Sequence, residues 1–187
     1  MKFFIFFYLF IQILWAKEIN YHFVDYNEAK KSSNFLKFES ESTKLGLVTT
    51  SFDGYAKKFK IIYERKNNQI TKLQVIVDAN SLDTDNDSRN EKMFGKCLES
   101  NKYHQITYDL TKPIGLNKTE AQAEGLLKIR GKKLNTPLNL SIVKAQQKYT
   151  VSGSAKFSLT QFEIPDPSIS IASVKDEFDL FFKIELE

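Results

Sequence analysis

The sequence predicts an all-β domain with one short helix, and three observations support this. Apolar and polar residues alternate along several segments, which places successive side chains on opposite faces of a sheet. Turn-forming residues separate these segments at short intervals. Only one segment carries a helix-capping pattern. Many short strands divided by such turns favour an antiparallel sandwich or barrel over a parallel sheet.

The predicted strands differ in how regular their alternation is. It is clearest in residues 73–77, 138–142 and 178–186, where every second side chain is apolar. Asn67 and Asn68 tolerate left-handed backbone and predict a turn just before the first of these segments. Weaker alternation predicts further strands at Tyr21–Val24, Phe35–Ser40, Phe52–Ala56, Phe59–Tyr63, Ile106–Leu110, Leu127–Ile129 and Tyr149–Phe157.

The single predicted helix begins at Ser88 and runs to about Leu98. Ser88 and Glu91 have the capping-box spacing, in which the serine hydroxyl caps the first turn and the glutamate reaches back to the serine amide. Helical periodicity then places three side chains on the inner face: Met93, Phe94 and Cys97.

The N-terminus predicts export. Lys2 precedes an apolar run that continues, interrupted only by Gln12, to Ala16. This run is shorter than the roughly 20 residues that a spanning helix needs, and Ala16 is a small residue suited to a signal-peptidase site. We therefore expect residues 1–16 to be a signal peptide, residues 17–187 to form one domain, and the mature protein to be periplasmic. An uncleaved membrane anchor is the alternative interpretation.

Charge and cysteine content limit the classes of partner. The net charge of +4 is spread over 27 basic and 23 acidic residues. Scattered lysines of this kind do not form the concentrated basic stripe that binds nucleic acid, although they allow transient contact with an anionic membrane surface. The lone Cys97 cannot form an internal disulfide, and we expect it to be a small buried hydrophobe.

Motifs for metal binding and catalysis are incomplete. The acidic segment from Asp83 to Asp87 begins like a calcium loop, but Ser88 and Phe94 stand where an EF-hand needs Gly and Glu. His22 and His104 are far apart in the chain and belong to no recognisable zinc or nucleophile signature. We expect no metal, no cofactor and no catalytic residue.

Four segments resemble the YceI-like family, the lipocalin-like polyisoprenoid-binding proteins of bacterial periplasms. Residues 75–89 are similar to that family's strand, Ser-x-x-Thr turn and Arg-containing helix start. The other three segments are 102–108, 125–140 and 157–162, which are followed by the alternating final strand. Residues 30–54 are the least similar part. The resemblance implies an antiparallel eight-stranded barrel with a helix near one end, enclosing an isoprenoid or fatty-acyl-like chain.

The interior of that barrel is the predicted binding site. An eight-stranded barrel has room for one slender ligand, and the inward phase of the regular strands selects the side chains that face it. Tyr108 can also hydrogen-bond a polar head group. The predicted ligand-binding residues are Leu73, Val75, Val77, Ile106, Tyr108, Leu127, Ile129, Leu138, Leu140, Phe178, Leu180 and Phe182.

Two other functions remain open at this point. Ile76 and Phe181 interrupt their alternations and would point outward, which is compatible with a non-catalytic interaction module or a homodimer. A secreted enzyme would have to use His22 or His104. The sequence does not distinguish between four ligands: a quinone, a polyisoprenoid carrier, a fatty acid and a fatty amide.

Overall fold

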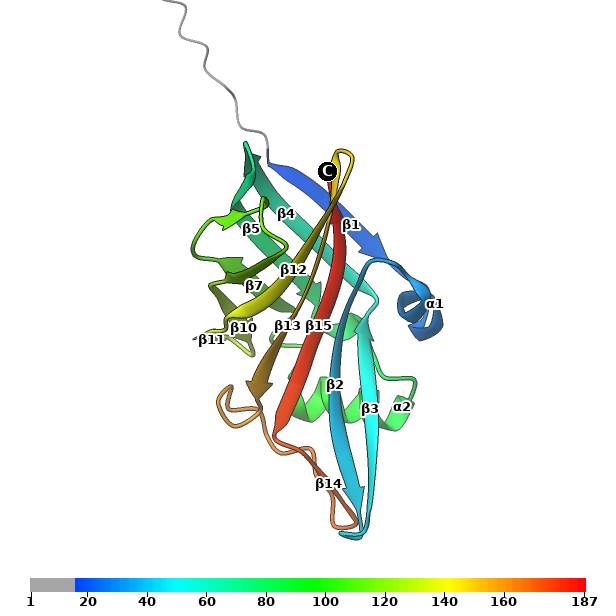
Figure 1. The fold of residues 1–187 in the computed structure, drawn as a ribbon. Helices are drawn as coiled ribbons and strands as arrows, with labels where there is room; N and C mark the ends of the chain where they lie inside the picture. The colour runs from blue at the N-terminus through cyan, green and yellow to red at the C-terminus, as the bar shows by residue number, and fades with distance from the viewer. Residues whose placement is uncertain (1–15) are drawn as a thin grey trace, which may run out of the picture.

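Antiparallel strands make up most of residues 16–187, the part of the chain that the computed structural model describes (Figure 1). Residues 1–15, with nearly all of the expected signal peptide, lie outside the described residues. One sheet runs in the order β1 (Lys17–His22), β4 (Lys58–Lys66), β5 (Gln69–Asp78), β7 (Gln105–Leu110), β10 (Gly125–Ile129) and β11 (Lys132–Asn135), with β8 (Ile114–Gly115) beside β5. The other runs β6 (Leu82–Asp83), β3 (Val48–Ala56), β2 (Phe35–Lys44), β15 (Glu177–Leu186), β13 (Lys148–Ser158), β12 (Leu138–Ala145) and β9 (Glu120–Ala123), with β14 (Ala172–Val174) beside β2.

The two sheets join at two corners, where the chain passes directly from one sheet into the other. Only Lys57 separates β3 from β4, and the 3-10 turn η1 (Ala79–Ser81) carries β5 into β6. At the opposite corner Glu124 separates β9 from β10, and Thr136 and Pro137 separate β11 from β12. If each pair of strands joined at a corner is counted as one bent strand, eight strands follow one another around the ring. Their order is β2, β3–β4, β5–β6, β7, β9–β10, β11–β12, β13 and β15. Each pairs with the next, and β15 pairs with β2. This confirms the predicted antiparallel eight-stranded barrel.

The predicted helix forms, but its start was misplaced. It comprises α2 (Asp87–Lys92) and a following π-helical turn η2 (Met93–Cys97). Its N-cap is Asn86, which has extended backbone angles and accepts a hydrogen bond from the Arg89 amide at 2.9 Å. Ser88 is exposed within the first turn. The capping-box prediction was wrong because asparagine caps as well as serine does and here comes first in the chain.

A second short helix, α1 (Tyr26–Lys31), was not predicted. Asp25 caps it by accepting from the Glu28 amide, and the Glu28 carboxylate accepts from the Val24 amide. This reciprocal cap ends the preceding strand early, so Val24 is exposed and the strand predicted at Tyr21–Val24 is instead β1, Lys17–His22. The predicted Asn67 turn is confirmed, since Asn67 has φ +55° in the β4–β5 hairpin.

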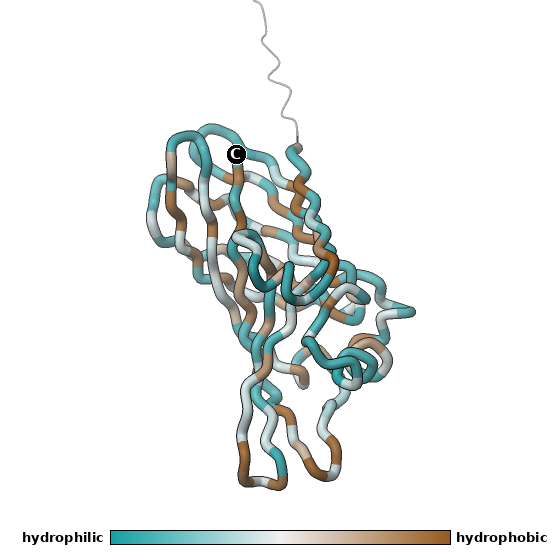
Figure 2. Tube along the Cα trace, turned by 90° about the vertical axis from the view of Figure 1, so that its right-hand side faces the viewer, coloured by the Kyte–Doolittle hydropathy of each residue, from teal (hydrophilic) through white to brown (hydrophobic). Residues whose placement is uncertain are grey.

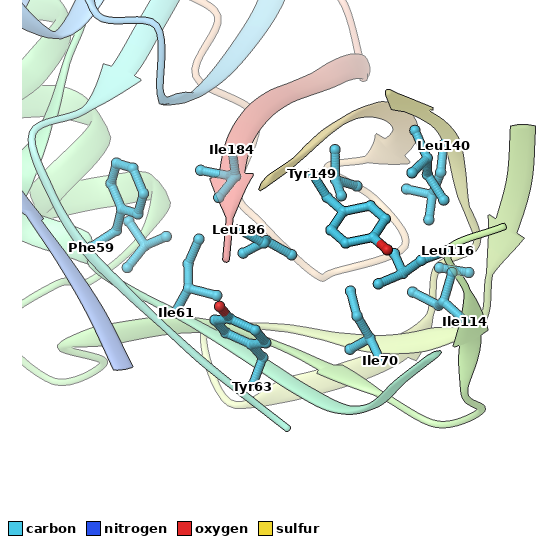
Figure 3. Packing of buried hydrophobic residues seen from close by; sticks show 14 of the residues in the cluster. Phe59, Ile61, Tyr63, Ile70, Ile114, Leu116, Leu140, Tyr149, Ile184 and Leu186 are labelled. Carbon is cyan, nitrogen blue, oxygen red and sulfur yellow. The ribbon is translucent and has the colours of Figure 1, made fainter. Parts of the chain in front are cut away.

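The apolar interior forms two main clusters, one at each end of the barrel. The end cluster lies near the β4–β5 and β12–β13 hairpins and includes Tyr63 and Ile70, which are almost completely buried (Figure 3). The second cluster lies under η2 and includes Cys97, Tyr108 and Phe178. Side chains of both clusters line one continuous space between the sheets.

Candidate ligand-binding cavity

A cavity of about 440 Å³ lies between the two sheets. Most of the side chains that line it are aliphatic or aromatic, and they come from both clusters. Its volume falls within the ~300–1,000 Å³ that is typical of small-molecule sites. The barrel interior is therefore not completely filled by its own side chains.

All twelve residues predicted from strand phase lie on the wall of this cavity. Their inward direction follows from the register, since Tyr108 is paired with Val75 on one side and with Leu127 on the other. Side chains at paired positions share one face of a sheet, and this row therefore faces the interior. That these residues contact a ligand remains a prediction.

Part of the cavity wall was not predicted, because its residues lie outside the strands with regular alternation. Helical turns, loops and the less regular strands β2 and β3 supply them. These residues include Phe38, Phe52, Met93, Cys97, Ile164, Pro167, Ile169, Ala172 and Val174. Cys97 is buried, as expected, and burial raises the pKa of its thiol. For the five lining residues from Ile164 to Val174, the available signal was the apolar content of that segment, which shows no regular alternation.

Tyr108 is the most unusual polar group in the cavity. Its side chain is 7% exposed, and its hydroxyl has no hydrogen-bond partner among residues 16–187. Burial raises the pKa of Tyr108 to about 12. Gly125 leaves room for the ring, because a Cβ there would lie 2.2 Å from the Tyr108 Cζ. A buried hydroxyl without a partner costs about 1–3 kcal/mol, so the site favours an occupant that accepts a hydrogen bond.

The charged side chains on the described wall are all cationic: Lys37, Arg89 and Lys92. Lys37 pairs with Glu39. Arg89 stacks over the Phe52 ring at 4.3 Å, and burial lowers its pKa. The Lys92 ammonium donates to the Pro167 carbonyl oxygen at 3.3 Å. Arg89 and Lys92 have no carboxylate within ion-pair distance in residues 16–187, and both remain able to face an anionic or strongly polar group.

The mouth of the cavity lies between α2 and the loop before β14. Ser88 on α2 and Ile169 in that loop both line the cavity and are exposed to solvent. Arg89 and Lys92 come from the same short helix as Ser88. A ligand held here would have its apolar part between the sheets and one end near α2.

The other candidate groups lie outside this cavity. His22 and His104 are both exposed and do not line it. The Asp83 carboxylate accepts hydrogen bonds from the Asn90 amide and the Asp85 backbone amide, and it pairs with Lys57 at 3.1 Å. Residues 16–187 contain no group of three or more His, Cys, Asp or Glu placed to hold a metal ion. No helix among the same residues is long and apolar enough to cross a membrane.

An antiparallel barrel around an apolar cavity defines a lipocalin-like fold. The chain belongs to the YceI-like family, because the model of the YceI-like domain matches residues 27–186. This match includes residues 30–54, the part that looked least similar in sequence. No curated protein sequence matches the chain.

Solved structures share the fold at low sequence identity. BcnA from Burkholderia cenocepacia has a TM-score of 0.67 and 18% identity, with 81% of this chain and 96% of that chain covered. A polyisoprenoid-binding domain from Saccharophagus degradans, implicated in plant cell wall breakdown, has a TM-score of 0.60 and 16% identity over 82% of this chain and 92% of that one. The YceI protein of Campylobacter jejuni has a TM-score of 0.61 and 19% identity over 71% and 82%, respectively.

Proposed function

We propose that this protein binds one long apolar molecule in its barrel, for transport, storage or sensing in the periplasm. The candidate ligands are a polyisoprenoid, a quinone and a fatty-acyl compound. The observation that carries the proposal is a largely apolar cavity whose wall includes Tyr108, a side chain whose hydroxyl has no partner in residues 16–187. The S. degradans domain, described as polyisoprenoid-binding, supports the same ligand class.

Elementary energetics favour such a ligand. Each methylene group moved from water into an apolar site contributes about 0.8 kcal/mol, and a chain of several carbons offsets the cost of ordering it. We infer that Tyr108, on the cavity wall, turns its free hydroxyl to the ligand, so a ligand carrying a carbonyl, ether or phosphate oxygen gains a hydrogen bond. A pure hydrocarbon would leave the Tyr108 hydroxyl without a partner.

Binding, rather than catalysis, is the activity that this cavity supports. Cys97 is its only thiol, and burial keeps that thiol protonated by raising its pKa. The histidines are exposed elsewhere. Export to the periplasm, which rests on the expected signal peptide, would place the barrel where insoluble lipids need a carrier.

Lipid extraction from matched variants tests the proposal. Leu138 and Val143 lie on β12, but Leu138 lines the cavity, whereas Val143 is exposed. Leu138→Trp fills the cavity, and Val143→Trp adds the same ring outside it. Mass spectrometry of solvent extracts, with protein purified from its own host, should recover a lipid from the wild type and Val143→Trp but much less from Leu138→Trp. Repeated absence of lipid above background from the wild type would refute the proposal.

The homodimer expected at Ile76 and Phe181 remains a prediction. Both side chains are half-buried, and the Lys37 ammonium covers the Phe181 ring at 4.9 Å from its centroid. This cover reduces the apolar area that the position offers to a second copy. Sedimentation of the purified protein distinguishes the states, and a strict monomer would remove the dimer interpretation.

A further inference from the structure

The end of the barrel opposite the end cluster carries an unusual group of exposed aliphatic side chains. They lie at the β2–β3 turn and in the loop before β14, and their exposed fractions run from 51% to 86%. Within residues 16–187, the other large exposed hydrophobics are Val24 and Val143. Figure 2 shows both loop ends as hydrophobic at the bottom of the molecule. We call this group, Leu45, Leu47, Val48, Ile169 and Ile171, the apolar tip.

The two loops of the apolar tip are held together by backbone pairing. The Leu45 amide donates to the Ile171 carbonyl oxygen at 2.9 Å, and β14 pairs with β2 from Ala172 opposite Lys44 (Figure 1). Leu47 in turn donates to the Lys44 carbonyl oxygen at 2.9 Å and closes a tight turn. The exposed side chains are therefore presented by one ordered projection.

Neither the backbone conformation of the β2–β3 turn nor burial explains why a leucine occupies it. Leu45 and Gly46 both have left-handed backbone, with φ of +50° and +68°. Such turns favour Asn-Gly or Asp-Gly, and a leucine there has neither turn preference nor burial. Contact with an apolar environment outside the barrel would account for it.

The charges around the apolar tip fit an anionic lipid surface. Residues 42–51 and 167–175 contain no acidic residue, and their only charged residues are Lys44 and Lys175. Lys175 lies 3.8 Å from Glu41, whereas Lys44 is exposed beside the turn. Serine and threonine supply most of the remaining positions and can hydrogen-bond lipid head groups. A lysine near an anionic lipid surface adds about 1 kcal/mol of attraction, and the exposed aliphatic side chains beside it gain by leaving water.

The apolar tip is continuous with the cavity. Ile169 belongs to both, and Pro167, Ala172 and Val174 extend the cavity wall along the same loop and strand. Ser42 continues it on β2. We propose that the apolar tip inserts into the surface of a lipid bilayer and so opens the cavity mouth directly onto lipid. Ligand transfer by this route rests on the proposed function, but membrane docking itself does not.

Single tryptophans provide a direct test of insertion. The only tryptophan of the sequence is Trp15, so a chain begun at Lys17 has none and keeps every element in Figure 1. Leu47→Trp in this chain should show a blue-shifted emission with phosphatidylethanolamine–phosphatidylglycerol vesicles, and brominated lipid should quench it. Val143→Trp is the matched control, because Val143 is exposed on β12, away from the apolar tip, and should show neither change.

Vesicle flotation measures the contribution of the apolar tip to affinity. Leu47→Asp should weaken binding roughly tenfold to a hundredfold, the loss expected for one leucine withdrawn from an apolar phase. Val143→Asp should bind as the wild type does. Lipid extraction from the wild type, described above, tests the proposed function independently, because vesicle binding is measured whether or not the cavity holds a lipid.

Three results would overturn the docking proposal. The first is no spectral change of Leu47→Trp on vesicles. The second is equal loss of vesicle binding in the Leu47→Asp and Val143→Asp variants. The third is a lipid-free dimer that Leu47→Asp converts to a monomer, which would assign the apolar tip to a second copy of the chain.

Discussion

Replacing Tyr108 with phenylalanine should make the empty protein more stable and make its ligand bind more weakly. The substitution keeps the ring and removes only the hydroxyl, which is buried without a partner in residues 16–187. A group of this kind costs about 1–3 kcal/mol. For a domain of this size, 1 kcal/mol shifts the melting temperature by about 2–4 °C. Tyr108→Phe should therefore raise the melting temperature of lipid-free protein by roughly 2–12 °C.

Tyr63→Phe is the matched control, because this tyrosine is equally buried but satisfied. Tyr63 is 1% exposed, and its hydroxyl donates to the Glu187 carbonyl oxygen at 3.0 Å and accepts from the Glu187 amide at 3.2 Å. Removing it should lower the free energy of unfolding by about 0.5–1.5 kcal/mol. The two substitutions delete the same atom in the same chain and should change stability in opposite directions.

The ligand reverses the effect of Tyr108→Phe. A hydrogen bond from Tyr108 to the ligand contributes about 0.5–1.5 kcal/mol, so its loss should weaken binding roughly twofold to tenfold. Differential scanning calorimetry of delipidated protein and calorimetric titration with the lipid recovered by extraction measure the two effects. A Tyr108→Phe protein that is less stable when empty, or that binds the lipid as tightly as the wild type, would refute the reasoning.

Three further predictions follow from individual sites. Burial acts to raise the pKa of Asp83, but hydrogen bonds and a lysine partner outweigh it and lower the pKa below 3.8. Its contribution to stability is therefore complete above pH 3.8 and declines as the pH falls through the native pKa. Asp83→Asn should lower the free energy of unfolding at pH 7 and match the wild type at the lowest pH. Urea unfolding curves at several pH values measure this difference. Gly153→Ala should lower the free energy of unfolding by about 1–3 kcal/mol, because its Cβ would lie 2.6 Å from a backbone oxygen. The control Gly95→Ala meets nothing within 4 Å and should not destabilise the protein. Thermal melts compare the two variants. In an ultraviolet pH titration, Tyr108 should ionise only near pH 12, and an ordinary phenol titration near pH 10 would contradict its burial.

The regular strands could be predicted because each carries its own two-residue period. Leu73, Val75 and Val77 alternate with polar neighbours, and the pleat requires such side chains to share a face. Burial of that face then sets the pairing register, as the row from Val75 through Tyr108 to Leu127 shows. The strands and much of the cavity wall were accessible from the sequence for this reason, whereas the eight-stranded barrel followed from the resemblance to the YceI-like family.

The start of α2 and the presence of α1 could not be predicted in the same way, because no regular pattern marks them. Asn86 and Ser88 both suit an N-cap, and the structure selects Asn86, which has extended backbone angles and accepts from the Arg89 amide. At α1, the cap by Asp25 competes with continuation of the strand toward Val24. In both cases two local solutions have similar free energies, and contacts with distant parts of the chain select one.

By itself, the sequence determined the all-β class and the inward phase of twelve side chains, because those properties depend on local periodicity. Only the tertiary structure decided which groups meet without being neighbours in the chain. It left the Tyr108 hydroxyl without a partner in residues 16–187 and placed Ile171 beside the β2–β3 turn. Both features depend on the whole packed structure. The hydroxyl lacks a partner because no other described residue brings one near it, and the apolar surface stays exposed because no other described segment packs over it.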